Sequence, residues 1–153
     1  MDFRNAVESD AEAISRLLQR LVARGKRTNP SSVDFARSQY ISNPDGVQCT
    51  VAVEEDGSVL GLQVLIRTTP DNPYGVEPGW GIIGTHVDPD AARRGIGKTL
   101  FARTREAARR AGIRKIDAFI AEENAEGLAY YEAMGFRTYR TPPGKICKCY
   151  TSE

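Results

Sequence analysis

The sequence from Val87 to Thr99 reads VDPDAARRGIGKT and joins an apolar run, GIIGTHV over residues 81–87, to a stretch with helical periodicity. This order predicts a strand, a glycine-containing loop and the start of a helix. The first turn of a helix has backbone N–H groups without intrahelical partners and carries partial positive charge, so it favours anions. Gly95 and Gly97 remove side chains where a phosphate would approach the backbone. The loop therefore predicts a pyrophosphate-binding site, to which three cations add charge: Arg93, Arg94 and Lys98.

Length and charge limit what can be built around this loop. The chain has 153 residues, which is enough for one well-packed domain, and we expect a single domain over residues 1–153. Its 21 basic and 20 acidic residues give a net charge of +1, so neither nucleic acid nor a membrane surface is indicated as a partner. No apolar run approaches the roughly 20 residues of a membrane span, and the N-terminus lacks the form of a signal peptide. A cytoplasmic location is therefore expected.

Three cysteines and one histidine give little support for a metal site. Cys49, Cys147 and Cys149 have neither a disulfide framework spacing nor a zinc-ligand spacing. We expect no bound metal.

Outside the loop, the periodicity of the sequence alternates between strand and helix. Capping-box patterns predict helices that begin at Ser9 and at Ser31 and end near Gly25 and Pro44. Further helices are expected from the loop to about residue 111 and over 124–134, and strands over 3–7, 50–53, 59–66, 81–87, 113–121, 136–141 and 146–151. Residues 68–79 are rich in Pro and Gly and predict a loop. This order indicates an α/β fold of the mixed α+β kind, with helices on both faces of a mixed sheet.

Two stretches of the sequence carry a family resemblance. ARRGIG over residues 92–97 is similar to a pattern of Gln or Arg, two residues, Gly, any residue, and Gly or Ala. NAEGLAYYEAMGF over residues 124–136 is similar to an Asn…Tyr-Glu…Gly-Phe segment. Both patterns belong to the GNAT superfamily of acyl-CoA-dependent N-acyltransferases, and the resemblance covers nearly the whole chain. The sequence differs from the family pattern at Ala92, where the family has Gln or Arg, so one side chain that usually caps the loop is absent.

The resemblance implies a fold and a reaction. The fold is a largely antiparallel sheet of about seven strands flanked by about four helices. The reaction transfers an acetyl group from acetyl-CoA directly to a primary amine of a small molecule or peptide, within a ternary complex. The resemblance assigns cofactor binding to Thr85, His86, Val87, Arg93, Arg94, Gly95, Ile96, Gly97, Lys98, Asn124 and Tyr131.

The resemblance also implies catalytic and acceptor-binding residues. Tyr131 matches the tyrosine that protonates the departing thiolate, and Tyr130 beside it is a competitor for that role. His86, the only histidine, is a candidate general base, and Glu77, Asp88 or a water chain would serve as well. Aromatic and acidic residues that flank the acceptor side in the family are Phe35, Tyr40, Tyr74, Glu77 and Trp80. A homodimer is the assembly that the resemblance implies.

Two other functions remain open from the sequence alone. Residues 92–99 also fit a relaxed P-loop pattern, in which Lys98 would bind phosphates and Thr99 would bind Mg²⁺ in a nucleotide hydrolase. That pattern normally requires a second strand ending in an Asp, whereas Asp117 lies inside an apolar run. The other possibility is a non-catalytic sensor that binds acyl-CoA without turnover. A simple strand-to-helix turn would also explain the two glycines.

Overall fold

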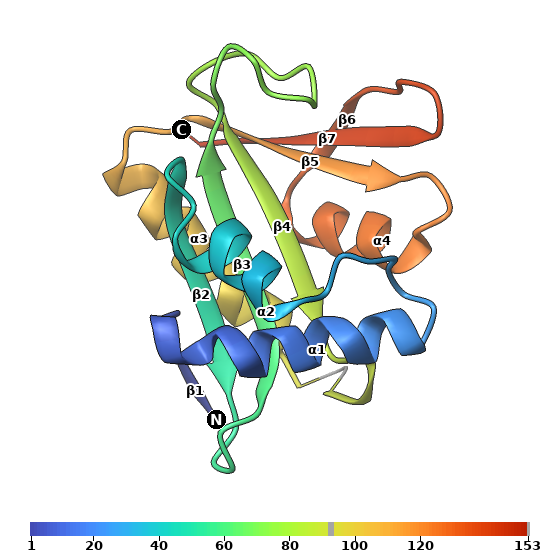
Figure 1. Cartoon of the computed structure of the whole chain (residues 1–153). Coiled ribbons are helices and arrows are strands. Elements are labelled where there is room, and N and C mark those ends of the chain that lie inside the picture. The colour runs from blue at the N-terminus through green and yellow to red at the C-terminus, as the bar shows by residue number, and fades with distance from the viewer. Residues whose placement is uncertain (92–93, 153) are drawn as a thin grey trace.

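A seven-stranded sheet with the strand order β1-β2-β3-β4-β5-β7-β6 organises the protein (Figure 1). The structure is a computed structural model and describes residues 1–91 and 94–152. The strands are β1 (Asp2–Asn5), β2 (Gly46–Val53), β3 (Val59–Arg67), β4 (Gly81–Val87), β5 (Lys115–Ala121), β6 (Arg137–Arg140) and β7 (Lys145–Thr151). The helices are α1 (Ala11–Ala23), α2 (Val33–Ala36), α3 (Ile96–Arg110) and α4 (Ala125–Met134). The predicted mixed, largely antiparallel sheet with helices is therefore confirmed.

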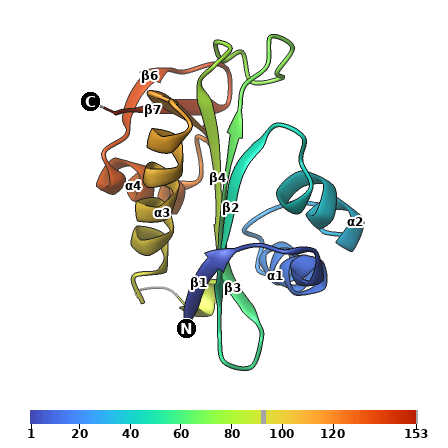
Figure 2. The ribbon, with the colours of Figure 1, turned by 90° about the vertical axis from the view of Figure 1, so that its left-hand side faces the viewer.

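Helices cover both faces of the sheet (Figure 2). We call the face under α1 and α2 the front face and the face under α3 and α4 the back face. Apolar residues at helical spacing in α1, such as Ile14, Leu17 and Leu18, are fully buried against the front face. On the back face, Phe101 of α3 packs against Phe136, which follows α4, with ring centroids 5.4 Å apart. These two cores hold the sheet between two helical layers.

Several predicted boundaries were wrong, and the N-terminal caps explain most of the differences. Ser9 does not cap α1, because the Asp10 carboxylate accepts the Val7 N–H at 2.8 Å and binds Arg4 at 2.8 Å, which produces a 3-10 turn over Glu8–Asp10. The second helix is capped by Ser32 and not by Ser31, since the Ser32 hydroxyl accepts the Phe35 N–H. That helix has only four α-helical residues before it continues as a π-helical turn over Arg37–Ile41. Strand β4 has its predicted bounds, and at the other strands and helices the boundaries shift by a few residues.

The separation of β4 from β5 is the feature of the sheet that positions a site. These two strands are parallel, and they pair only where Gly81 meets Ile116 and Ile82 meets Asp117. Both strands continue beyond those pairs, and Figure 1 shows them diverging toward their C-terminal ends. Meanwhile β4 stays in register with β3 along its whole length. The backbone groups of β4 that point away from β3 are therefore left facing a gap between the strands.

No helix in the described part of the chain has both the length and the apolar character needed to cross a membrane. Among the same residues, no group of three or more His, Cys, Asp or Glu side chains could hold a metal ion.

Candidate active site

A pocket of about 440 Å³ lies where β4 and β5 separate. It is lined by residues 83–87 of β4, by Phe119 to Ala121 of β5, by Gly97 at the start of α3, and from α4 by Glu126, Gly127, Tyr130 and Tyr131. Successive side chains of a strand point to opposite faces, so Thr85 faces α4 on the back and His86 faces the π-helical turn after α2 on the front. The pocket is thus bounded by side chains from both faces of the sheet.

The start of α3 forms one end of this pocket and is held by α4. Gly95 has a φ of 74°, a left-handed conformation that favours glycine, and it precedes the first residue of the helix. The Tyr130 O–H donates to the Gly97 carbonyl at 2.6 Å, and the Gln63 amide donates to the Tyr130 oxygen at 2.9 Å. A Cβ on Gly97 would come within 2.6 Å of the Tyr130 ring, which is too close for any side chain. The second glycine of the loop is therefore required by packing.

The cations of the loop differ in their contacts with other residues. Arg94 forms an ion pair of 3.0 Å with Glu54, which lies directly after β2. Lys98 is exposed, whereas the Ile96 side chain is buried, so only the backbone of Ile96 is available to a ligand. Ala92 and Arg93 lie outside the described residues. The phosphate-binding role of these residues remains a prediction.

Asn124 begins α4 and lines the pocket. Its side-chain oxygen accepts the Gly127 N–H at 3.0 Å, which caps the helix. Within residues 1–91 and 94–152, the amide nitrogen of Asn124 donates no hydrogen bond. This position fits the predicted cofactor contact, although the helix cap alone would also explain the residue.

Tyr131 faces the pocket from α4 and is almost fully buried, with 7% of its surface exposed. Its hydroxyl lies 2.9 Å from the hydroxyl of Thr85, which also accepts a hydrogen bond from Gln63 at 2.9 Å. Burial raises the pKa of Tyr131, and the hydrogen bond with Thr85 opposes this only in part. The phenol therefore keeps its proton over the whole physiological pH range and can donate it.

His86 lies between Arg27 and Tyr40 on the front face. Its Nε2 is 3.3 Å from Nη1 of Arg27 and 3.2 Å from the Tyr40 hydroxyl oxygen. A guanidinium can only donate, so Nε2 accepts and the ring is neutral with its proton on Nδ1. Burial, together with the charge of Arg27, lowers the pKa of His86 to about 4. Such a histidine is a weak base at neutral pH, which favours a positioning role for it.

The other two predicted bases are also poorly placed. Asp88 is buried and forms an ion pair of 2.7 Å with Arg20 of α1. Glu77 is exposed and belongs to the loop over residues 68–80, and it is not among the residues that line the pocket.

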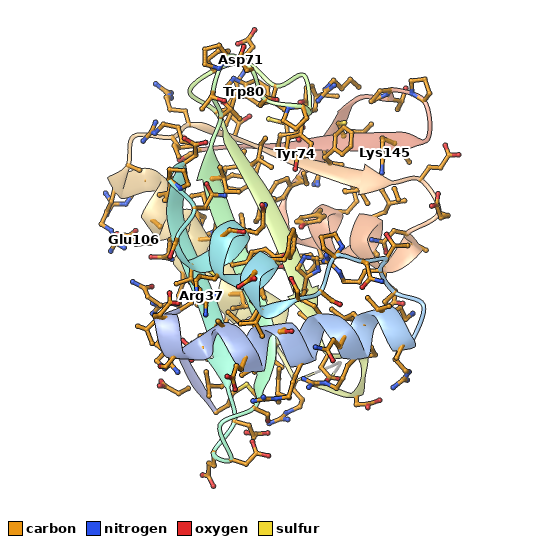
Figure 3. All side chains as sticks on the ribbon, in the orientation of Figure 1. Arg37, Asp71, Tyr74, Trp80, Glu106 and Lys145 are labelled. Atoms are coloured by element: carbon orange, nitrogen blue, oxygen red, sulfur yellow. The ribbon has the colours of Figure 1, made fainter. Side chains whose placement is uncertain are left out.

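The aromatic residues predicted to bind the acceptor fall into two groups. Phe35 and Tyr40 pack edge to face beside His86, with centroids 5.8 Å apart. Tyr74 packs against Phe119, a pocket residue, with centroids 5.3 Å apart. Trp80 instead packs against Tyr139 at 5.5 Å, at the opposite end of β4 from the pocket (Figure 3). None of the five residues lines the pocket, but Tyr40 and Tyr74 contact the lining residues His86 and Phe119.

Comparisons with known proteins agree with this geometry. A family model described as "Acetyltransferase (GNAT) family" matches residues 13–136. The chain belongs to the GNAT acetyltransferase family. A GCN5-related N-acetyltransferase from Kribbella flavida is 26% identical, has a TM-score of 0.78 and matches over 99% of this chain and 97% of its own. A protein from Salmonella typhimurium, solved with its cofactor acetyl-CoA, shares the fold with a TM-score of 0.72 at 20% identity over 98% of this chain and 92% of its own.

A curated relative covers less of the chain. A mycothiol acetyltransferase from Saccharomonospora viridis is 30% identical over 93 residues, which is 60% of this chain and 30% of the relative. The chain therefore spans less than a third of the length of that relative.

The P-loop alternative is wrong for this GNAT protein. The strand before the glycine loop is antiparallel to β3, and Asp117 is fully buried within β5, where it accepts a hydrogen bond of 2.6 Å from Tyr139. Asp117 is thus not placed to bind a metal at the end of a strand beside the loop. Thr99 is exposed in the first turn of α3.

Three features of the site were missed from the sequence. Tyr130 supports the Gly97 carbonyl, and Gln63 links the hydroxyls of Thr85 and Tyr130 through one amide nitrogen. Lys26, beyond the end of α1, forms an ion pair with Glu126 of α4, and both residues line the pocket. A glutamine in the middle of an apolar strand was the one signal in the sequence that could have pointed to this network.

Proposed function

We propose that the protein catalyses acetyl transfer from acetyl-CoA to the amine of a small molecule or peptide, by direct transfer in a ternary complex. The observation that carries the proposal is the pocket between β4 and β5, which has a glycine loop at a helix N-terminus at one end and a buried tyrosine in its wall. These are the parts that binding a pyrophosphate and protonating a thiolate require.

The residues present fit acetyl-CoA. Free N–H groups at the start of α3, with Lys98 and Arg94 close in sequence, would hold the pyrophosphate. Backbone groups of residues 83–87 that face away from β3 would bind the extended arm, because they have no partner on β5. Asn124 would contact that arm from α4. When bound, acetyl-CoA supplies an acetyl group activated as a thioester.

Each remaining step is assigned to residues of this chain. An N–H of β4 beside Thr85 would stabilise negative charge on the thioester oxygen. Tyr131 would donate its proton to the leaving sulfur and regain one through the Thr85 hydroxyl, which is 2.9 Å away. Because Tyr131 and Thr85 lie on the back face with α4, the acceptor amine would enter from the front face, past His86 and Phe119.

We further propose that the amine loses its proton to water in the pocket. His86 has a pKa lowered to about 4, Asp88 is paired with Arg20, and Glu77 lies outside the pocket. None of these three side chains is suited to take a proton at neutral pH. Water can connect the amine to solvent without a dedicated side-chain base.

The pH dependence of the reaction tests this proposal. With acetyl-CoA saturating and thiol release measured from pH 6 to 10, we expect kcat/KM to rise with the neutral fraction of the acceptor. The midpoint should therefore shift with the amine when two acceptors whose pKa values differ by about one unit are compared. A midpoint that stays fixed for both acceptors would show that a group of the enzyme is the base. An absence of thiol release with every amine, despite cofactor binding, would instead support a non-catalytic sensor.

A further inference from the structure

Four cations on the front face lie over aromatic rings and form no ion pair with a carboxylate of the described residues. No carboxylate in the described part of the chain lies within 4.0 Å of their nitrogens, although other basic side chains of the protein form such pairs. The four pairs and their distances to the ring centroids are Arg27 over Phe35 at 5.8 Å, Lys115 over Trp80 at 5.3 Å, Arg140 over Tyr139 at 5.5 Å and Lys145 over Phe119 at 5.3 Å. This face therefore carries positive charge that the described carboxylates do not neutralise by direct contact.

Of these four cations, Lys145 lies next to an aromatic ring that lines the pocket. It begins β7 and pairs with Ala121, the last residue of β5. Its ammonium lies over Phe119, whose ring lines the pocket and also contacts Tyr74. Figure 3 shows Tyr74 and Lys145 on the same side of the sheet. The Lys145 charge is thus at the front edge of the pocket, where the acceptor would enter.

Carboxylates near this entrance are buried, paired or directed to solvent. Asp117 is fully buried and accepts the Tyr139 O–H. Glu126 is paired with Lys26. Glu122 and Glu123 follow β5 and are largely solvent-exposed, without a described ion pair to Lys145. Arg27, whose Nη1 lies 3.3 Å from Nε2 of the pocket residue His86, adds a second positive charge.

We propose that the acceptor is an amine that also carries a carboxylate, and that Lys145 is the counter-ion of this carboxylate. The proposal rests on the proposed acetyl transfer and names its substrate class. A carboxylate beside Lys145 would gain a charge-assisted contact at the edge of an aromatic pocket, where water screens it less than in bulk. Polyamines and other polycationic amines would be disfavoured by the two cations, Lys145 and Arg27.

The test compares acceptors that differ only in this charge. L-Phenylalanine and L-leucine are assayed against their amides by thiol release, and rates are expressed per neutral amine because the amide lowers the amine pKa. For the wild type we expect each acid to exceed its amide in kcat/KM by about tenfold. Lys145→Gln should raise KM for the acids about tenfold, with kcat unchanged, and should leave the amides unaffected. The matched control is Lys115→Gln, which removes the same charge from the same face about 13 Å along β5 from Phe119, and it should change neither class.

Two outcomes would overturn the inference. The first is a wild type that uses amides as well as acids, and the second is a Lys145→Gln variant that loses both classes equally. Calorimetric titration of the same acids and amides into the protein saturated with CoA gives a second readout that needs no turnover. Preference for acids in that titration without acetyl transfer would support this inference while contradicting the proposed reaction. Equal binding of acids and amides would contradict the inference whatever the activity.

Discussion

Replacing Tyr131 by Phe is expected to lower kcat by about 10²-fold or more, while KM for acetyl-CoA stays near the wild-type value. General acid catalysis by a positioned side chain is worth about 10²–10⁴-fold, and the substitution removes only the hydroxyl that lies 2.9 Å from Thr85. The ring is retained, so its packing against Phe136, with centroids 5.1 Å apart, should hold the fold. Steady-state kinetics by thiol release, with the melting temperature as a check on folding, measures this effect.

The neighbouring tyrosine provides the matched control. Tyr130→Phe removes the same group from the same pocket, but the Tyr130 hydroxyl donates its proton to the Gly97 carbonyl. We therefore expect Tyr130→Phe to raise KM for acetyl-CoA with a much smaller effect on kcat. If Tyr131→Phe retained full kcat at every pH, or if both variants lost kcat alike, Tyr131 would not be the acid.

Replacing Gly97 by Ala is expected to weaken acetyl-CoA binding by about tenfold or more and to destabilise the protein by about 1–3 kcal/mol. The added Cβ would lie 2.6 Å from Cε1 and 3.2 Å from Cζ of the Tyr130 ring. The rigid Tyr130 ring cannot change conformation to avoid the added Cβ as the end of a flexible side chain can. Helix α4 or the start of α3 must therefore move. That movement would displace the N–H groups proposed to hold the pyrophosphate. Calorimetric titration with acetyl-CoA, combined with denaturant unfolding, measures both effects.

Substitution of a second glycine, Gly81, distinguishes a general loss of stability from a specific loss of acetyl-CoA binding. A Cβ on Gly81 would lie 2.7 Å from Cδ1 of Leu65, and Gly81 is not a lining residue of the pocket. Gly81→Ala should therefore lower stability without a specific loss of acetyl-CoA affinity. Comparable losses of affinity in both variants would mean that the Gly97 effect is only destabilisation.

The fold could be predicted largely because its signals are local. Strand β4 was predicted with its observed bounds, since GIIGTHV is an apolar run followed directly by loop residues. The shortness of α2 could not be predicted, because the helical pattern of residues 31–44 gives no sign of the π-helical turn that begins at Arg37. The caps at Ser9 and Ser31 were wrong for a related reason. Neighbouring Asp10 and Ser32 make the competing hydrogen bonds, and a capping pattern does not show which residue will make them.

The parts of the site that lie in the family motifs could be predicted from the sequence. The contacts between residues far apart in the sequence could not. Tyr131, Asn124 and Gly97 line one pocket as the motifs suggested. The environment of His86 depends on Arg27 and Tyr40, which lie 59 and 46 residues away in the sequence. Its low pKa therefore could not be read from the strand in which it sits. Trp80 packs against Tyr139, which is far from it in the sequence, and its acceptor-binding role remains a prediction.

The most direct test of the central claim is a thermal-shift titration with acetyl-CoA, CoA, and ATP with Mg²⁺ side by side. A ligand at about 100 times its dissociation constant adds about 2.7 kcal/mol of stability, which corresponds to several degrees in melting temperature. The account predicts such a shift with acetyl-CoA and CoA, its reduction in Gly97→Ala, and none with ATP and Mg²⁺. A shift with ATP and Mg²⁺ and none with acetyl-CoA would contradict the assignment of the pocket between β4 and β5.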